Sequence, residues 1–180
     1  MTRRFGSVLA KTACVLAILA AGPAAASAQS WEFLKGTYWS VPQENLLAFA
    51  VSPKLPAPLP SQDQTVYHIT DYHGGFFWGS NVTSINGNIT CATLLGSVTP
   101  DGRVLLSFVS TAADGTTSQQ VGYGQMTQSD GAWTMLNQTA APNFAHWAYM
   151  VQSKPGDASW KSLPGVRQSV PEFLGQCGAA

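Results

Sequence analysis

The sequence predicts an all-β protein, an eight-stranded antiparallel up-and-down barrel with a C-terminal tail tied to it by a disulfide. Three observations support this prediction. Between Trp31 and Met150 no apolar repeat of about 3.6 residues is sustained, so long amphipathic helices are not expected. The stretches between turns are rich in Val, Ile, Thr and aromatic residues, which favour strands. Turn-forming residues recur every 12 to 15 residues, at Gly74, Gly87, Asp101, Gly115, Asp130 and Pro142.

The strands follow from this punctuation. The turns separate seven expected strands, and one more strand is expected ahead of them at 36–41. Sequential strands joined by hairpins form a meander, and eight can close into a barrel whose interior is filled or holds one small ligand. The seven are expected near residues 65–73, 75–85, 88–98, 103–111, 117–128, 132–139 and 144–152.

Three segments lie outside this repeat. Residues 44–51 fit either a short helix or another strand. Residues 52–61 hold four prolines and are expected to form an extended surface loop. After Gln152 the chain becomes irregular, with one helical turn expected at 171–174.

The N-terminus is typical of a secretory signal peptide. Three cations, Arg3, Arg4 and Lys11, precede a short apolar run that ends in small residues and Ala26-Ser27-Ala28. We expect residues 1–28 to be removed after Ala28, leaving residues 29–180 as one barrel domain, secreted or periplasmic. The mature chain then carries 6 Lys and Arg against 9 Asp and Glu, a net charge of −3. It has no basic patch for nucleic acid and no second long apolar stretch for a transmembrane anchor.

Two cysteines remain after cleavage, Cys91 and Cys177. An even count in an exported chain favours a disulfide, here between a mid-barrel strand and the tail. Closing so long a loop would stabilise the fold by about 4–5 kcal/mol. Two buried free thiols are the alternative.

Gly36-Thr37-Tyr38-Trp39 opens the first strand and is followed by a long loop, a hairpin meander and a tail tied to the barrel. In this the chain resembles the calycin group, which comprises lipocalins and avidin-like proteins. The resemblance implies a barrel that binds a small, largely apolar molecule in its mouth.

The strands are nearly free of charge, which favours a neutral ligand. Residues 72–100 and 131–153 contain no Asp, Glu, Lys or Arg, whereas aromatic residues are concentrated there. The leading hypothesis is therefore a small neutral, hydrophobic or aromatic ligand held in the barrel. The alternative is that the aromatic residues are core and cross-strand pairs. The candidate ligand-binding residues are Tyr38, Trp39, Tyr67, Trp78, His146 and Trp147.

A second hypothesis is an enzyme on the same scaffold, an isomerase, lyase or cyclase that moves one proton on an apolar substrate. The candidate catalytic residues are His68, Asp71, His73 and His146. His68 and His146, if both point inward, would also suit a metal, but no third ligand is evident, so no metal site is expected. No cofactor motif is present, so no cofactor is expected. The alternative is that Asp71 and His73 flank an exposed turn and that His146 is a core histidine.

A third hypothesis is an oligomeric envelope or surface protein, a possible homo-oligomer whose outer aromatics form subunit contacts. Strand alternation places Phe76 and Trp78 on one face and Phe77 on the other, and Trp147 opposite His146. Aromatic residues on both faces suit a barrel covered outside by a partner subunit or by its own tail.

Overall fold

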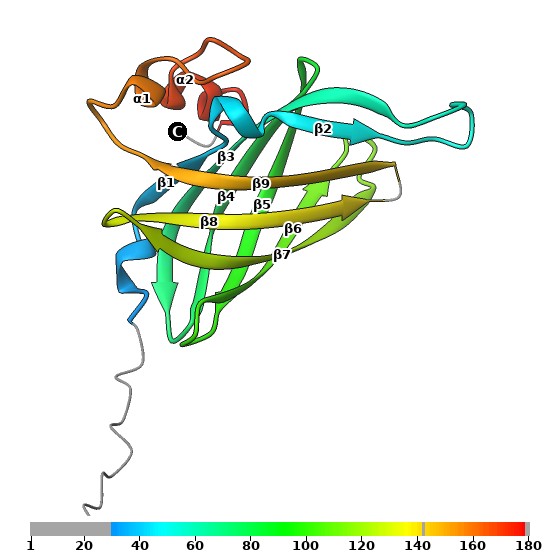
Figure 1. Cartoon of the computed structure of the whole chain (residues 1–180). Helices are drawn as coiled ribbons and strands as arrows, with labels where there is room; N and C mark the ends of the chain where they lie inside the picture. The colour runs from blue at the N-terminus through cyan, green and yellow to red at the C-terminus, as the bar shows by residue number, and fades with distance from the viewer. Residues whose placement is uncertain (1–29, 142, 179–180) are drawn as a thin grey trace, which may run out of the picture.

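The strands form one closed sheet in the computed structural model, which describes residues 30–141 and 143–178 (Figure 1). The predicted signal peptide, residues 1–28, lies outside the described residues. The strands are β1 (Thr37–Ser40), β2 (Leu47–Ala50), β3 (Leu59–His73), β4 (Phe76–Ile85), β5 (Asn88–Val98), β6 (Arg103–Thr111), β7 (Thr117–Ser129), β8 (Ala132–Ala141) and β9 (Phe144–Ser153). The helices are the 3-10 turns η1 (Glu32–Leu34) and η2 (Gln43–Asn45) and the α-helices α1 (Ala158–Lys161) and α2 (Val170–Gly175).

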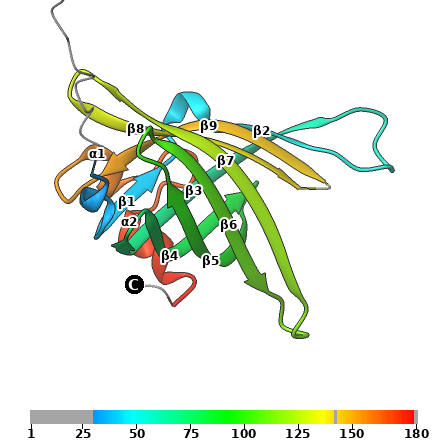
Figure 2. The ribbon, with the colours of Figure 1, turned by 90° about the horizontal axis from the view of Figure 1, so that it is seen from below.

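β1 and β2 together fill one position in the barrel wall. Each pairs antiparallel with β3 on one side and with β9 on the other. β3 to β9 then pair in sequence order, each antiparallel to the next. The nine strands of the described chain therefore fill eight wall positions, which confirms the predicted eight-stranded antiparallel meander barrel (Figure 2).

The segment between β1 and the rest of β3 differs in detail from the sequence-based expectation. Residues 44–51 form both of the alternatives in turn, the end of η2 and then β2. The proline-rich loop expected over 52–61 is shorter, because β3 begins at Leu59 and Pro60 lies opposite Phe49 of β2. The pairing of β3 with β4 starts only at Asp63, so Pro60 has a strand neighbour on one side alone. Proline is tolerated there because an edge position needs no second ladder hydrogen bond.

Apolar side chains fill one half of the barrel, which we call the filled half. Fully buried residues from alternating positions of many strands meet there, including Trp39, Phe77 and Leu106. The turn η1 closes this end: Trp31 packs edge-on against Trp133 at 5.0 Å and donates from Nε1 to the carbonyl oxygen of Thr99. A ligand space can therefore exist only toward the opposite end, which we call the mouth.

The C-terminal segment covers part of the outer wall. Val170 and Phe173 of α2 pack on Val66 of β3 and Val82 of β4, forming a second apolar cluster outside the barrel. The helical turn predicted at 171–174 is confirmed within α2, whose start is fixed by a reciprocal capping box between Ser169 and Glu172.

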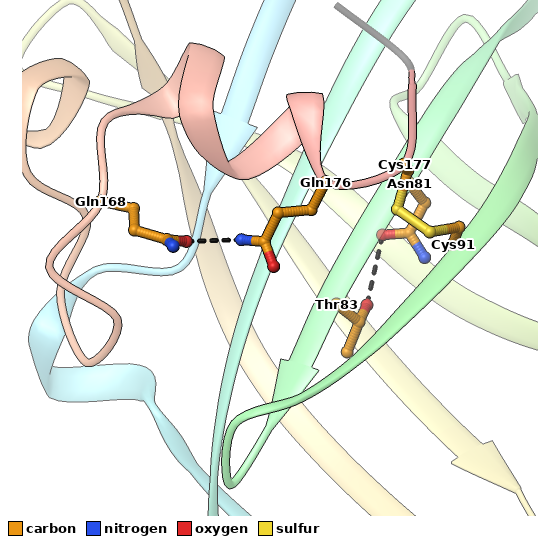
Figure 3. Close-up of a disulfide and its surroundings, with 6 residues drawn as sticks. All are labelled: Asn81, Thr83, Cys91, Gln168, Gln176 and Cys177. Atoms are coloured by element: carbon orange, nitrogen blue, oxygen red, sulfur yellow. Dashed lines mark hydrogen bonds between the residues drawn. A yellow bond between two sulfur atoms is a disulfide. The ribbon is translucent and has the colours of Figure 1, made fainter.

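The predicted disulfide between Cys91 and Cys177 is confirmed (Figure 3). It joins β5 to the residues just after α2, with the two Cα atoms 5.7 Å apart. Next to it, Gln176 donates to Gln168 at 2.6 Å, a contact within the C-terminal segment (Figure 3). The tail is therefore held on the barrel by one covalent bond in addition to the apolar cluster.

Backbone crowding requires glycine in the wall at Gly79 of β4. A β-carbon at this position would overlap the carbonyl oxygen of His68 on the neighbouring strand β3. The β3–β4 register slips between Ile69 and Asp71, opposite this glycine. Gly79 therefore lets the two backbones approach where the bulge bends the wall.

Candidate functional site

A cavity of about 70 Å³ lies inside the barrel between the filled half and the mouth. Its lining is mixed. Hydroxyl, amide and ionic side chains from all the strands from β3 to β9 alternate with aromatic and aliphatic ones. The volume is enough for several water molecules or a compact organic group, and smaller than the pockets that hold drug-sized ligands. The lining residues are Val41, Asp63, Thr65, Tyr67, Asn81, Thr83, Ile85, Thr90, Ala92, Phe108, Ser110, Gln120, Asn137, Thr139, Phe144, His146, Ala148 and Met150.

A buried ion pair stands at one wall of this cavity. Nδ1 of His146 on β9 lies 2.9 Å from Oδ2 of Asp63 on β3, and the two side chains are only 7% and 5% exposed. The other ring nitrogen, Nε2, lies 2.8 Å from the carbonyl oxygen of Asn45. The imidazole therefore links β9 to β3 and to η2, the turn that separates β1 from β2.

The hydrogen-bond partners set the protonation of His146. A carbonyl oxygen only accepts, so Nε2 donates to Asn45, while Nδ1 lies at hydrogen-bond distance from the Asp63 carboxyl group. Burial alone would lower the pKa of His146, but the hydrogen bond and charge of Asp63 and the Asn45 carbonyl outweigh it and raise the pKa above its ordinary value. In the protonated form that this shift favours, both nitrogens donate to protein oxygens and neither offers a lone pair to a substrate.

Hydroxyl and amide groups continue from the ion pair around the cavity. Thr65 donates to Oδ1 of Asp63 at 2.7 Å, and its oxygen lies 2.9 Å from that of Thr83. Thr83 in turn donates to Oδ1 of Asn81 at 3.3 Å. This network places neutral polar groups from β3 and β4 on one side of the cavity.

A second network joins β8 to β3. Asn137 of β8 donates to the Tyr67 hydroxyl at 2.5 Å and accepts from Thr139 at 3.2 Å. Burial and the nearby charge of Asp63 raise the pKa of Tyr67 well above its ordinary value, so the phenol stays neutral. The Tyr67 ring also contacts Phe108, with ring centroids 5.5 Å apart. Aromatic faces and neutral hydrogen-bonding groups therefore share the same space.

The structure places the six candidate ligand-binding residues in three environments. Tyr67 and His146 line the cavity. Trp39 is fully buried in the filled half, where its Nε1 donates to Thr37. The other three lie outside the barrel: Tyr38 packs under the C-terminal segment, while Trp78 and Trp147 are 40% and 48% exposed.

The four candidate catalytic residues do not come together. His68 lies outside the barrel and stacks on Tyr38 with ring centroids 4.3 Å apart, and burial lowers its pKa. Asp71 forms an ion pair with Lys35 at 2.7 Å, and His73 is exposed at the end of β3. His146 therefore stands apart from all three, and Asp63 is its carboxylate partner.

Asp63 is the site residue that sequence reasoning missed. The expected strand began at residue 65, after the proline-rich segment, so Asp63 fell outside it. Alternation extended two residues back from Tyr67 and Thr65 would have placed Asp63 on the same inward face. That signal alone gives the side of the strand. It does not give the partner on β9, which is 83 residues away.

Among the residues that the structure describes, no group of three or more His, Cys, Asp or Glu is arranged to hold a metal ion. No helix in the described ranges has the length and apolar character needed to span a bilayer. Comparisons with protein-family models, with curated proteins and with solved structures find no match for this chain. The candidate site must therefore be interpreted from its own geometry.

Proposed function

We propose that the protein is an exported, calycin-like binding barrel that holds a small neutral molecule in the cavity between its filled half and its mouth. The mixed lining of that cavity is the observation that carries the proposal. Tyr67, Phe108 and Phe144 offer apolar faces, while amides and hydroxyls beside them offer donors and acceptors. A ligand with one small ring or short chain and two or three hydrogen-bonding groups matches this arrangement.

Charge supports a neutral ligand. Asp63 and His146 are the two ionisable side chains of opposite sign among the lining residues, and they are bonded to each other. An added ligand charge would meet a pair that is already satisfied and would lose its hydration without compensation. The proposed ligand is therefore neutral, as expected from the charge-free strands, but it also has hydrogen-bonding groups.

Export is supported by two separate features. The sequence of residues 1–28 has the pattern of a secretory signal. The Cys91–Cys177 disulfide is a bond that persists in oxidising compartments. We propose a secreted or periplasmic location on this basis.

An acid–base enzyme has weaker support than a binding protein. A general base needs a lone pair within reach of its substrate, and both ring nitrogens of His146 are already engaged with protein oxygens. His68 and Asp71 lie in other parts of the fold.

The test combines ligand discovery with a matched pair of variants. Natively purified protein is extracted and analysed by mass spectrometry, and small neutral compounds are screened by thermal shift. Ala92→Leu adds bulk inside the cavity, and Thr93→Leu adds bulk on the outer face of the same strand. We expect Ala92→Leu to weaken a stabilising compound at least about tenfold, a loss of about 1.4 kcal/mol, with Thr93→Leu unchanged. No bound molecule and no stabilising compound, or equal effects of both variants, would remove the support for a cavity ligand.

A further inference from the structure

A largely apolar surface covers the outside of β4, β5, β6 and β7. We call it the β4–β7 face. Its large hydrophobic side chains are strongly exposed, and Tyr123, Phe76 and Leu95 reach 63%, 58% and 51%. Exposed patches of this size on a soluble domain mark interaction sites. The face consists of Phe76, Trp78, Leu95, Leu105, Val109, Val121 and Tyr123.

Strand register makes this face continuous. One row of directly opposed residues runs Trp78, Leu95, Ser107 and Val121 across the four strands. A neighbouring row runs Phe76, Ser97, Leu105 and Tyr123. Opposed side chains on one face of a sheet lie about 4.5–5.5 Å apart at Cβ, so each row forms a ridge of three apolar side chains and one serine. Two adjacent ridges of this kind suit packing against another sheet.

The face is also neutral. Over the whole of β4, β5, β6 and β7 the single charged side chain is Arg103, the first residue of β6, and it is paired with Asp101 at 2.9 Å. Two copies of this surface would meet without burying an unpaired charge and without repulsion between like charges. A self-complementary surface is what a twofold interface requires.

The exposed area matches what a dimer needs. The three aromatic residues, each with about 150–250 Å² of surface, present on the order of 350 Å² at their exposed fractions. The four aliphatic residues, 36% to 51% exposed, add to this area. Polar residues at the rim supply the remainder of the roughly 800 Å² that each partner buries in an interface of standard size.

One side of the barrel does not share this character. The C-terminal segment, with Arg167 and Glu172 exposed, covers the outer wall of β3 and the adjoining part of β4. A lipid-immersed barrel needs an apolar band around its whole circumference. Exposed apolar side chains recur on β2 and β9, at Phe49, Trp147 and Tyr149, but the C-terminal segment interrupts the circumference at β3. An interrupted apolar surface matches a protein partner better than a bilayer.

We propose that the β4–β7 face is the contact surface between two copies of this chain. The proposal is independent of the cavity ligand, because the face lies on the opposite side of the wall from the cavity lining. The dimer joins two barrel walls through their paired ridges and leaves both mouths open.

The experiment measures the mass of the disulfide-bonded chain by sedimentation at micromolar concentrations. The wild type is expected to sediment as a dimer. Leu95→Lys places a charge inside one ridge, and Tyr123→Lys places one at the end of the other. Both are expected to give monomers, with a dissociation constant raised at least about a hundredfold. Circular dichroism and the thermal midpoint establish that each variant is folded, and having two variants on different strands keeps the test valid if one fails to fold.

Two controls separate this face from other surfaces. Ile89→Lys also points outward from β5, with Ile89 37% exposed, but lies beside the C-terminal segment. Trp147→Lys charges a different apolar group on β9. Both are expected to remain dimers. A monomeric wild type, a dimer that survives both ridge variants, or a dimer lost only in Trp147→Lys would overturn the proposal. So would flotation of the wild type with phosphatidylcholine vesicles, which would assign the face to lipid.

Discussion

Asp63→Asn tests the buried ion pair by removing its charge and little else. The carboxylate uses both oxygens, one accepting from His146 Nδ1 and the other from Thr65 Oγ1. An asparagine has the same shape, and its oxygen can face Nδ1 while its amide donates to the Thr65 oxygen. The hydrogen bonds are therefore replaced, and the measured change reports the loss of the negative charge beside a buried imidazolium.

The expected cost is about 3 kcal/mol, the lower end of the range for breaking a buried pair, because His146 can relieve part of it by losing its proton. For a chain of this size that lowers the thermal midpoint by about 6–12 °C. The raised pKa of His146 fixes the pH dependence. Stabilisation by the pair is fully present below about pH 6.5, the ordinary value for histidine, and is lost as pH rises through the folded-state pKa. The gap between wild type and variant should therefore be widest in mild acid and narrow toward alkaline pH.

Chemical denaturation followed by tryptophan fluorescence, under non-reducing conditions at several pH values, measures this gap. Asp130→Asn is the matched control, because Asp130 is an exposed turn residue with positive φ, a conformation that asparagine also adopts. A difference below about 1 kcal/mol in mild acid, or a gap that widens as pH rises, would refute the assignment of His146 as a buried imidazolium paired with Asp63.

Three further outcomes are expected. Burial lowers the folded-state pKa of His68, so its protonation favours the unfolded chain and the free energy of unfolding falls as pH drops below about 6.5. His68→Phe should reduce this acid sensitivity in denaturation titrations. An unchanged pH profile would contradict the expectation. Replacing Cys91 and Cys177 together by serine should lower the free energy of unfolding by about 4–5 kcal/mol, since the bond closes a loop of 86 residues; a loss under about 1 kcal/mol would show that the tail is held by packing alone. Gly79→Ala should destabilise the fold by about 3 kcal/mol or more, or prevent folding. Gly175→Ala is the control: a β-carbon there would meet open space and φ is ordinary, so stability should change by under about 1 kcal/mol. Equal thermal midpoints of the two variants would refute the close backbone approach at β4.

The hairpin architecture could be predicted from sequence because turn chemistry is local. Asn86-Gly87 and Asp130-Gly131 each adopt positive φ at both residues, the conformation that two-residue hairpins require. The alternation of side chains along a strand is also a local property, so it could be read from the sequence. On β9, Phe144, His146 and Met150 face the interior while Trp147 is exposed, as their spacing predicts.

The candidate site could not be predicted in the same way because it depends on barrel closure. Asp63 meets His146 only because β2 joins β3 to β9 across the seam of the sheet. No local pattern specifies that pairing. Aromatic content was also ambiguous, since Trp78 and Trp147 are as apolar as Trp39 but lie on the other side of the wall. Periodicity groups residues by face, and only the closed sheet decides which face is inside.

The divided wall position formed by β1 and β2 has a consequence for local opening. Each of these strands is four residues long, whereas β3 to β9 have nine to fifteen. Short strands have few ladder hydrogen bonds, so amide hydrogen exchange should begin at this seam while the hairpin strands remain protected. His146 lines both the interior cavity and an outer pocket formed with Phe49 and Trp147, so it lies where such an opening would join the two. The backbone expected to open first therefore lies beside the Asp63–His146 ion pair, and the exchange rate of the β2 amides is expected to respond to the loss of that pair.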